Sequence, residues 1–389
     1  MMPFIDLKTQ FQRVEEDVRR RMDAVLAHGN FIMGPEVAEL EAGLTGFAGV
    51  AHCVTCSSGT DALLMALMAL GVGPGDAVFT SPFTFIATAE VISLIGATPV
   101  FVDIDAGSYT LDPARLEAAI RAVLDRDAAG HPLPPAALEG EGLTPRVVLP
   151  VDLYGQPSDY DAINAVADEF NLTVVADAAQ SFGAIYKGRR AVAAPQIACT
   201  SFFPAKPLGC LGDGGALFTD DDALAEVCRS LRVHGKGDHK YDNVRTGLNA
   251  RLDTLQAAAL LPKLAIFPDE LDRRQAVAEI YSARLGALGT LTLPVMPEAT
   301  TSAWAQYTLR SPLREAIQES LKGDGVPSVV YYPCPLHLQK AYVSLGLGTG
   351  SFPAAEAAAG EVFSIPMHPY LSKSDIDMIC GCIEKAASR

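Results

Sequence analysis

Apolar residues along the chain form short runs separated by helical patterns and turns. Thr60–Leu70 has the apolar spacing of a helix and ends at Gly71. Ala77–Thr80 follows a Gly-Pro-Gly-Asp turn and predicts a strand. The same pattern then predicts, in order, a helix at Phe85–Ile95, a strand at Pro99–Ile104, a helix starting at Asp112–Pro113, and strands at Arg146–Asp152, Thr173–Asp177 and Ile197–Phe203. Nearly continuous apolar strands between helices are typical of a mostly parallel sheet covered on both faces, so we expect an α/β fold with ligands at the carboxyl ends of its strands.

The alternation of strands and helices fades from about Pro262. A helix over Glu270–Leu288 and a last helix over Lys373–Ala387 enclose a mixed region. We therefore predict a large α/β domain over residues 1–261 and a smaller α+β domain over residues 262–389.

Composition restricts the kinds of partner. The 389 residues carry a formal net charge of −16, which argues against a nucleic-acid-binding surface because such a surface needs clustered basic residues. An anionic cofactor in a locally basic pocket remains compatible with this charge. The N-terminus has no apolar signal segment, and no run approaches the ~18 apolar residues that span a bilayer. We expect a cytoplasmic protein that does not bind a membrane.

Two close cysteine pairs, Cys53/Cys56 and Cys380/Cys382, raise the question of a zinc site. The first pair lies in a strand-like run and the second in a helix-like segment, and neither has the turn residues of a zinc knuckle. We expect reduced thiols and no metal. The stretch 125–144 is rich in Pro, Ala, Gly and Glu and predicts a surface insertion without a catalytic role.

Lys206 follows the apolar strand Ile197–Phe203 and is flanked by Pro204, Pro207 and Gly209, which make a stiff loop. Desolvation at a strand end lowers the pKa of a lysine and favours the neutral amine that condenses with aldehydes. An ordinary surface lysine is the alternative, and for Lys206 taken alone it is the better one.

Two further features of the sequence favour a reactive Lys206 over an ordinary surface lysine. Asp177 ends the apolar strand Thr173–Asp177, where a carboxylate needs a partner such as a protonated ring nitrogen, although capping of the next segment is an equal alternative. Ser57–Asp61 precedes an apolar helix and places small residues and hydroxyls where backbone N–H groups bind anions. Plain N-capping would use the same residues. An amine, a carboxylate and an anion site are together what pyridoxal phosphate (PLP) requires.

With these pieces the chain resembles the DegT/DnrJ/StrS sugar aminotransferases, which have the aspartate-aminotransferase (type I) PLP fold. The resemblance runs nearly end to end. It is carried in particular by Gly34-Pro-Glu-Val, Ser57-Ser-Gly-Thr-Asp-Ala-Leu, Gly73-Pro-Gly-Asp, Asp177-Ala-Ala-Gln-Ser-Phe-Gly, Ser201-Phe-Phe-Pro-Ala-Lys-Pro-Leu-Gly, Gly212-Asp-Gly-Gly and Asn249-Ala-Arg-Leu-Asp.

The resemblance implies roles for the matching residues. Lys206 would form the Schiff base with PLP and shuttle protons, and Asp177 would pair with the ring nitrogen. The remaining contacts to the cofactor would come from Gln180 at the ring hydroxyl, Phe85 on the ring face, Gly59, Thr60 and Ser201 at the phosphate, and Asn249 at the phosphate in the neighbouring subunit of a homodimer with shared active sites. The implied reaction moves the amino group of L-glutamate to a nucleotide-linked oxo-sugar.

Within the family, the chain most resembles the 3-aminotransferases that act on UDP-2-acetamido-2-deoxy-3-oxo-glucuronate, for surface polysaccharide. Arg251 is a suitable partner for a uronate carboxylate, and holding its own loop is the alternative. The resemblance also places Tyr331, Tyr332 and His337 on the sugar side. Related enzymes usually carry His-Tyr-Pro where this chain has Tyr331-Tyr-Pro, which leaves the sugar, the nucleotide and the aminated carbon open.

Other functions fit less well. Sugar dehydratases of the family replace the lysine by histidine, whereas Lys206 is present here. A non-catalytic regulator would have no need of Asp177, Gln180, Ser201 and Lys206 together.

Overall fold

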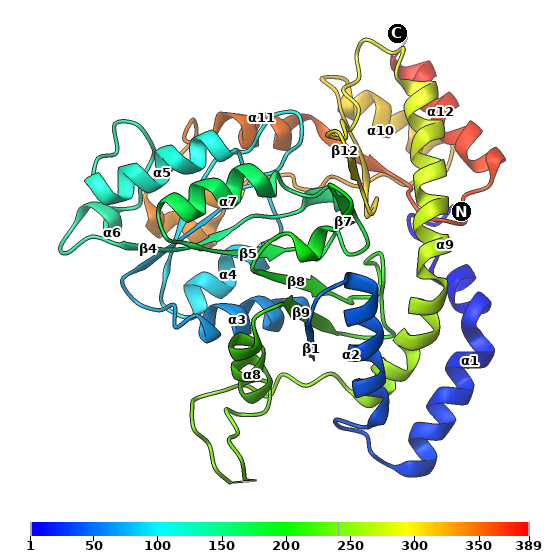
Figure 1. The fold of residues 1–389 in the computed structure, drawn as a ribbon. Coiled ribbons are helices and arrows are strands. Elements are labelled where there is room, and N and C mark those ends of the chain that lie inside the picture. Colours follow the sequence, from blue (N-terminus) through cyan, green and yellow to red (C-terminus); the bar gives the residue numbers. More distant parts are fainter. Residues whose placement is uncertain (1, 240, 388–389) are drawn as a thin grey trace.

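The structure is a computed structural model that describes residues 2–239 and 241–387. A central sheet carries helices on both faces, and a smaller group of helices and strands lies beside it (Figure 1). Seven strands make the central sheet in the order β1-β9-β8-β5-β4-β2-β3. Their bounds are β1 His52–Cys56, β2 Asp76–Thr80, β3 Thr98–Phe101, β4 Thr144–Leu149, β5 Thr173–Asp177, β8 Ile197–Ser201 and β9 Gly215–Thr219.

The sheet is mostly parallel, which confirms the predicted α/β fold. The pairs β2·β3, β2·β4, β4·β5 and β5·β8 are parallel, whereas β9 is antiparallel to both of its neighbours, β8 and β1. The parallel strands bring the ends of β5 and β8 to one edge of the sheet, so that Asp177 and the residues after Ser201 lie on the same side.

Alternate strand residues bury themselves against helices on opposite faces. On β5, Val174 packs with α5 and α7, and Val175 packs with α3. Figure 1 shows α5 and α7 on one side of the sheet and α3, α4 and α8 on the other. The helices of this part are α1 Leu7–His28, α2 Pro35–Ala48, α3 Gly59–Ala69, α4 Ala87–Leu94, α5 Pro113–Asp125, α6 Pro135–Leu138, α7 Tyr160–Glu169 and α8 Asp222–Leu231, with the 3-10 turns η1 Leu153–Gly155 and η2 Ala191–Ala193.

The long helix α9, Thr254–Leu285, joins the two parts of the molecule. The sequence predicted a helix only from Glu270, whereas Pro262 and Pro268, residues that ordinarily interrupt a helix, both lie inside α9. The helix nevertheless starts at Thr254, since a continuous buried run before Pro262 packs against the sheet domain and outweighs local propensity. The predicted domain boundary at 261/262 falls inside this helix, and the division into two domains remains a prediction.

The C-terminal part packs around a core that includes Tyr281, Tyr307 and Phe363. Its elements are β10 Thr300–Thr301, β11 Tyr307–Arg310, α10 Arg314–Gly323, η3 Leu336–Leu338, η4 Lys340–Leu345, α11 Pro353–Glu361, β12 Val362–Ile365 and α12 Lys373–Ala387. β11 pairs with β12, while β10 pairs with the hairpin β6 Ile185–Tyr186 and β7 Arg189–Arg190 of the sheet domain.

The stretch 125–144 lies between α5 and β4, as predicted, and contains the short helix α6. Its His131 is buried, and Nε2 of this residue lies 2.8 Å from the carbonyl oxygen of Phe101 at the end of β3. No helix within residues 2–239 and 241–387 is long and apolar enough to cross a membrane.

Candidate active site

Asp177 is the last residue of β5 and is buried beneath the strand ends, with 7% of its surface exposed. Its Oδ2 accepts a hydrogen bond of 2.7 Å from Thr88 on α4, and its Oδ1 accepts one of 3.1 Å from the amide of Ala179. Burial raises the pKa of this carboxyl, while Thr88, Ala179 and the charge of Lys206 act in the opposite direction. A cationic partner in the site would stabilise the ionised form of this carboxyl.

Lys206 lies in a tightly folded loop after β8. Its amide donates to the carbonyl of Phe203 at 2.8 Å, and the amide of Cys210 closes the loop on Phe202 at 2.8 Å. A Cβ atom on Gly209 would lie 2.4 Å from the carbonyl oxygen of Pro204, so only glycine permits this closure. Burial lowers the pKa of Lys206, and Asp177 counteracts it. The charges of Lys206 and Asp177 therefore influence each other's pKa across the strand ends.

Gln180 is held between two tyrosines. Its Oε1 accepts a hydrogen bond of 2.7 Å from the amide of Tyr154, and its Nε2 lies 3.3 Å from the hydroxyl of Tyr332. Tyr154 has a φ of 62°, and its hydroxyl donates to the carbonyl of Tyr331. Because the amide oxygen is occupied by Tyr154, the NH2 of Gln180 is directed at the site as a donor.

The start of α3 forms a cradle with the end of β8. Ser58 caps the helix, its Oγ accepting from the amide of Asp61 at 3.0 Å, and the first helical amides have no acceptor within the helix. A Cβ on Gly59 would lie 2.7 Å from Cβ of Ser201, so glycine allows the two segments to meet. The sequence-predicted Gly59, Thr60 and Ser201 are therefore brought together at a helix N-terminus suited to a phosphate.

Aromatic side chains form one wall of the site. The rings of Phe85 and Tyr332 lie 6.4 Å apart at a tilt of 39°, and Phe83 meets Tyr332 edge-on at the same distance. Phe85 is 56% exposed, which leaves a face open to a flat ligand. Burial, followed by the charge of Asp177, raises the pKa of Tyr332, so its hydroxyl stays protonated.

Asn249 and Arg251 lie together, with Nη2 of Arg251 donating to Oδ1 of Asn249. They line a pocket of about 390 Å³ whose other walls are Ile32, Ser57, Asp213, Asp253 and Gln256. The amide of Ser57, next to the cradle, donates to the carbonyl of Ala250 at 3.2 Å. Within one chain, Asn249 and Arg251 therefore lie beside the cradle of Gly59 and Ser201.

Of the three residues expected on the sugar side, Tyr331 and Tyr332 lie together, with ring centroids 5.8 Å apart, whereas His337 pairs with Glu356. Tyr331 is half-buried and its ring lies 6.3 Å from that of Phe4, while Tyr332 reaches into the site through Gln180. His337 is 1% exposed, and its Nε2 lies 3.1 Å from Oε1 of Glu356. Burial lowers its pKa, against the influence of Glu356. A role of His337 in substrate binding remains a prediction.

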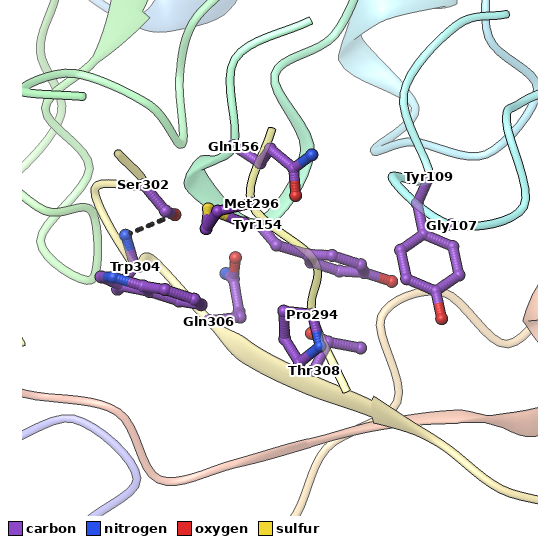
Figure 2. Close-up of a pocket in the computed structure, with 10 residues that line it drawn as sticks. All are labelled: Gly107, Tyr109, Tyr154, Gln156, Pro294, Met296, Ser302, Trp304, Gln306 and Thr308. Atoms are coloured by element: carbon purple, nitrogen blue, oxygen red, sulfur yellow. Dashed lines mark hydrogen bonds between the residues drawn. The ribbon is translucent and has the colours of Figure 1, made fainter. Parts of the chain in front are cut away.

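Tyr154 also borders a small pocket on its far side. Figure 2 shows its ring between Tyr109 and the segment that carries Ser302, Trp304 and Gln306. The cavity measures about 10 Å³, room for one water molecule rather than for a substrate.

Sequence reasoning missed Thr88 and Tyr154, which hold Asp177 and Gln180. Both follow the carboxyl ends of strands, in Phe85-Ile-Ala-Thr88 after β2 and in Leu153-Tyr-Gly after β4. Polar residues at such positions were a usable signal, but their partners become apparent only when the sheet brings the strand ends together.

The two close cysteine pairs lie within regular secondary structure. Cys53 and Cys56 lie in β1, Cys380 and Cys382 lie in α12, and all eight cysteines are free thiols. Among the described residues, no group of three His, Cys, Asp or Glu side chains could hold a metal ion.

The residues present fit PLP. A buried carboxylate with a raised pKa matches a ring nitrogen that carries a proton, the Gly59–Ser201 cradle matches a phosphate, and Lys206 matches an aldehyde. The fold and the site together define the class: a PLP-dependent enzyme of the aspartate-aminotransferase (type I) fold. The sequence matches the DegT/DnrJ/EryC1/StrS aminotransferase family over residues 12–384, and the chain belongs to this family.

Relatives extend over the whole chain. A protein of Pseudomonas aeruginosa named UDP-2-acetamido-2-deoxy-3-oxo-D-glucuronate aminotransferase is 48% identical over 385 residues, which cover 98% of this chain and 99% of that protein. A Streptomyces venezuelae protein named dTDP-3-amino-3,4,6-trideoxy-alpha-D-glucose transaminase is 37% identical over 390 residues, covering 100% and 97%.

Solved structures agree with the fold. A DegT/DnrJ/EryC1/StrS aminotransferase from Brucella abortus superposes with a TM-score of 0.94 at 45% identity and covers 100% of both chains. NtdA from Bacillus subtilis, solved with bound cofactor PMP, superposes with a TM-score of 0.88 at 28% identity, covering 100% of this chain and 85% of that one. The predicted family, aminotransferase activity and PLP dependence are thereby confirmed.

Proposed function

We propose that this enzyme moves the amino group of L-glutamate to a nucleotide-linked oxo-sugar, and that UDP-2-acetamido-2-deoxy-3-oxo-D-glucuronate is its first candidate substrate. The observation that carries the proposal is that Lys206, on a stiff loop after β8, lies at the same edge of the sheet as the buried carboxylate of Asp177, whose charge raises the pKa of the lysine. The P. aeruginosa relative, at 48% identity, supports the sugar. The cytoplasmic location expected from the sequence remains part of this proposal.

PLP supplies an aldehyde for amines and a ring that stabilises negative charge on the neighbouring carbon. Lys206 would bind that aldehyde until the amine of the substrate displaces it, and the freed Nζ would then take a proton from the substrate carbon and return it to the cofactor carbon. Asp177 would hold the ring nitrogen protonated, and the NH2 of Gln180 would donate to the ring hydroxyl. Phe85 would cover the ring face, while Gly59, Thr60 and Ser201 would bind the phosphate.

A homodimer with shared active sites is part of the proposal, and Asn249 would there reach the phosphate of the partner subunit's cofactor. The segment between α8 and α9 extends away from the body of the chain (Figure 1). Large apolar side chains are exposed around this region and the pocket of Arg251, namely Phe31, Ile32, Met33, Phe203, Leu211 and Val244. Such a concentration of exposed apolar surface favours association with a second copy.

The cofactor assignment is tested by absorbance. Purified protein supplied with PLP should show the band of lysine-bound cofactor, and L-glutamate should convert it. Lys206→Ala should lose the band and lower turnover by at least ~10³-fold, with Lys187→Ala as an exposed control that keeps both. Full turnover by Lys206→Ala would refute the proposed role of this lysine.

The sugar is tested with a panel of oxo-sugar nucleotides, amino-group transfer being measured with L-glutamate as donor. If Arg251 binds the uronate carboxylate, Arg251→Gln should lower kcat/KM for the uronate by ~10–100-fold and leave neutral oxo-sugars nearly unchanged. Asp213 and Asp253 line the same pocket, and their carboxylates disfavour a further carboxylate from the substrate there. An equal loss on all substrates would instead assign Arg251 to holding its loop with Asn249.

The alternative is a 3- or 4-aminotransferase for another UDP-, dTDP- or GDP-linked sugar. The S. venezuelae relative, named for a dTDP-sugar, and the presence of Tyr331 instead of the usual histidine both favour including these sugars in the panel.

A further inference from the structure

Lys263 is a buried cation that the proposed reaction does not use. It lies on α9 with 3% of its surface exposed, within an otherwise apolar stretch of that helix. Its Nζ donates a hydrogen bond of 2.7 Å to the carbonyl oxygen of Gly209. Removing an ammonium group from water is unfavourable, so a buried lysine with a carbonyl as its bonded acceptor needs an explanation.

The surroundings of Lys263 are sparsely charged. Burial lowers its pKa, and the groups that oppose this effect are Cys210 and Glu270. The carboxylate of Glu270 already accepts hydrogen bonds from Gln10 and Tyr370. Lys263 is thus directed to the loop rather than to a neutralising partner.

The acceptor of this bond belongs to the loop that carries Lys206, residues 202–211. The loop is closed internally by the amides of Lys206 and Cys210, which donate to Phe203 and Phe202. From α9, a second side chain holds the end of the loop, because Oε1 of Gln256 accepts from the amide of Leu211 at 2.8 Å. Gln256 and Lys263 are seven residues apart, close to two helical turns, so they face the loop from the same side of α9.

We infer that Lys263 is a positioning residue, which fixes the carbonyl of Gly209 and thereby holds the loop so that Nζ of Lys206 faces Asp177. This inference rests on the proposed role of Lys206 and extends it to a residue outside the site. It explains why the cation is retained: a charged donor makes a stronger hydrogen bond than a neutral one, and this bond lies at the junction of the loop with α9.

The test compares Lys263→Met with Arg274→Met. Arg274 is a second buried cation on α9, 3% exposed, which donates to the carbonyls of Trp304 and Met367 and does not touch the loop. It therefore controls for the loss of a buried charge. Lys263→Arg keeps the cation, and Lys263→Gln keeps a donor without a charge and replaces Lys263→Met if that variant does not fold.

The first readout is hydrogen exchange of the Lys206 and Cys210 amides in apoprotein, which needs neither cofactor nor turnover. Exchange should be about tenfold faster or more in Lys263→Met, unchanged in Arg274→Met and partly restored in Lys263→Arg. Unchanged exchange at both amides, with a thermal midpoint lowered as in Arg274→Met, would overturn the inference and leave Lys263 a structural residue.

The second readout is the pH midpoint of the absorbance band of lysine-bound cofactor, together with kcat. Lys263→Met should shift this midpoint and lower kcat by ~100-fold, whereas Arg274→Met should do neither. Failure of the proposed function gives a different result, because wild-type protein would then lack the band or Lys206→Ala would retain it. A wild-type band with an unshifted midpoint in Lys263→Met would count against the positioning role alone.

Discussion

The backbone amide of Tyr154 donates a hydrogen bond of 2.7 Å to Oε1 of Gln180 and so fixes which end of this side-chain amide faces the site. The NH2 end then lies 3.3 Å from the hydroxyl of Tyr332. Asp177 is held in a comparable way by Thr88 and Ala179. The groups proposed to contact the cofactor are thus oriented by neighbours that need not touch it.

Two substitutions of Gln180 distinguish the role of its Oε1 from the role of its NH2 group. Gln180→Leu leaves the buried amide of Tyr154 without its acceptor, so the unfolding free energy of apoprotein should fall by about 1–3 kcal/mol. Gln180→Glu keeps an acceptor for that amide but loses the donor, and should cost less stability while still changing the absorbance of bound PLP. Urea denaturation and absorbance measure the two effects. Equal stability of the Leu variant and wild type would contradict the role given to Tyr154.

Asp177 should control the ionisation of Lys206. Burial lowers the pKa of the lysine and the carboxylate raises it, so Asp177→Asn should lower this pKa further. The neutral, reactive amine then exists at lower pH. Labelling of Lys206 in apoprotein with trinitrobenzenesulfonate, followed by peptide mass spectrometry across a pH series, should show the midpoint moving to lower pH. Thr88→Val keeps the carboxylate charge and should leave the midpoint nearly unshifted, whereas a rise in Asp177→Asn would contradict the coupling.

The close approach of Gly59 to Ser201 predicts a loss of cofactor affinity in Gly59→Ala. The added Cβ would lie 2.7 Å from Cβ of Ser201 and would separate α3 from β8. PLP affinity, measured by absorbance titration, should fall by about tenfold or more because phosphate hydrogen bonds are lost. Gly46→Ala is the matched control: it lies inside α2 with nothing within 4 Å of the added Cβ, and should gain ~0.5–1 kcal/mol in urea denaturation. Equal affinity of Gly59→Ala and wild type would exclude the cradle as the phosphate site.

Much of the fold followed from local pattern. β5 and α12 have the bounds that apolar spacing predicted, because strands buried on both faces and amphipathic helices carry their own signatures. The start of α9 at Thr254 could not be predicted from local pattern. Tertiary packing of a buried run overrode two prolines there, and such packing has no local signature in the sequence.

The site could be predicted to a similar extent. Lys206, Asp177 and Gly59 became candidates because a stiff loop, a strand end and a helix start are visible in sequence and because these residues occur together in motifs that resemble the family. Thr88 and Lys263 were not, because each acquires its meaning from a partner far away in the chain, Asp177 and Gly209. Contacts of this kind are fixed by topology rather than by spacing.

His368 makes stability depend on pH. It is 3% exposed, and burial followed by the cation of Arg274 lowers its pKa to about 4, from an ordinary value of 6.5. Between these two values the unfolded chain binds a proton that the folded chain does not, so the contribution is fully present above pH 6.5 and is lost as the pH falls toward 4. The loss amounts to about 3 kcal/mol.

Asp152 titrates in the same window with the opposite sign, because burial raises its pKa to about 6 and thereby favours the folded state at low pH. The quantity to measure is therefore the difference in unfolding free energy between wild type and His368→Gln, by urea denaturation at several pH values. This difference should shrink by about 3 kcal/mol between neutral pH and pH 4, and parallel pH curves for the two proteins would show that His368 does not titrate as its burial predicts.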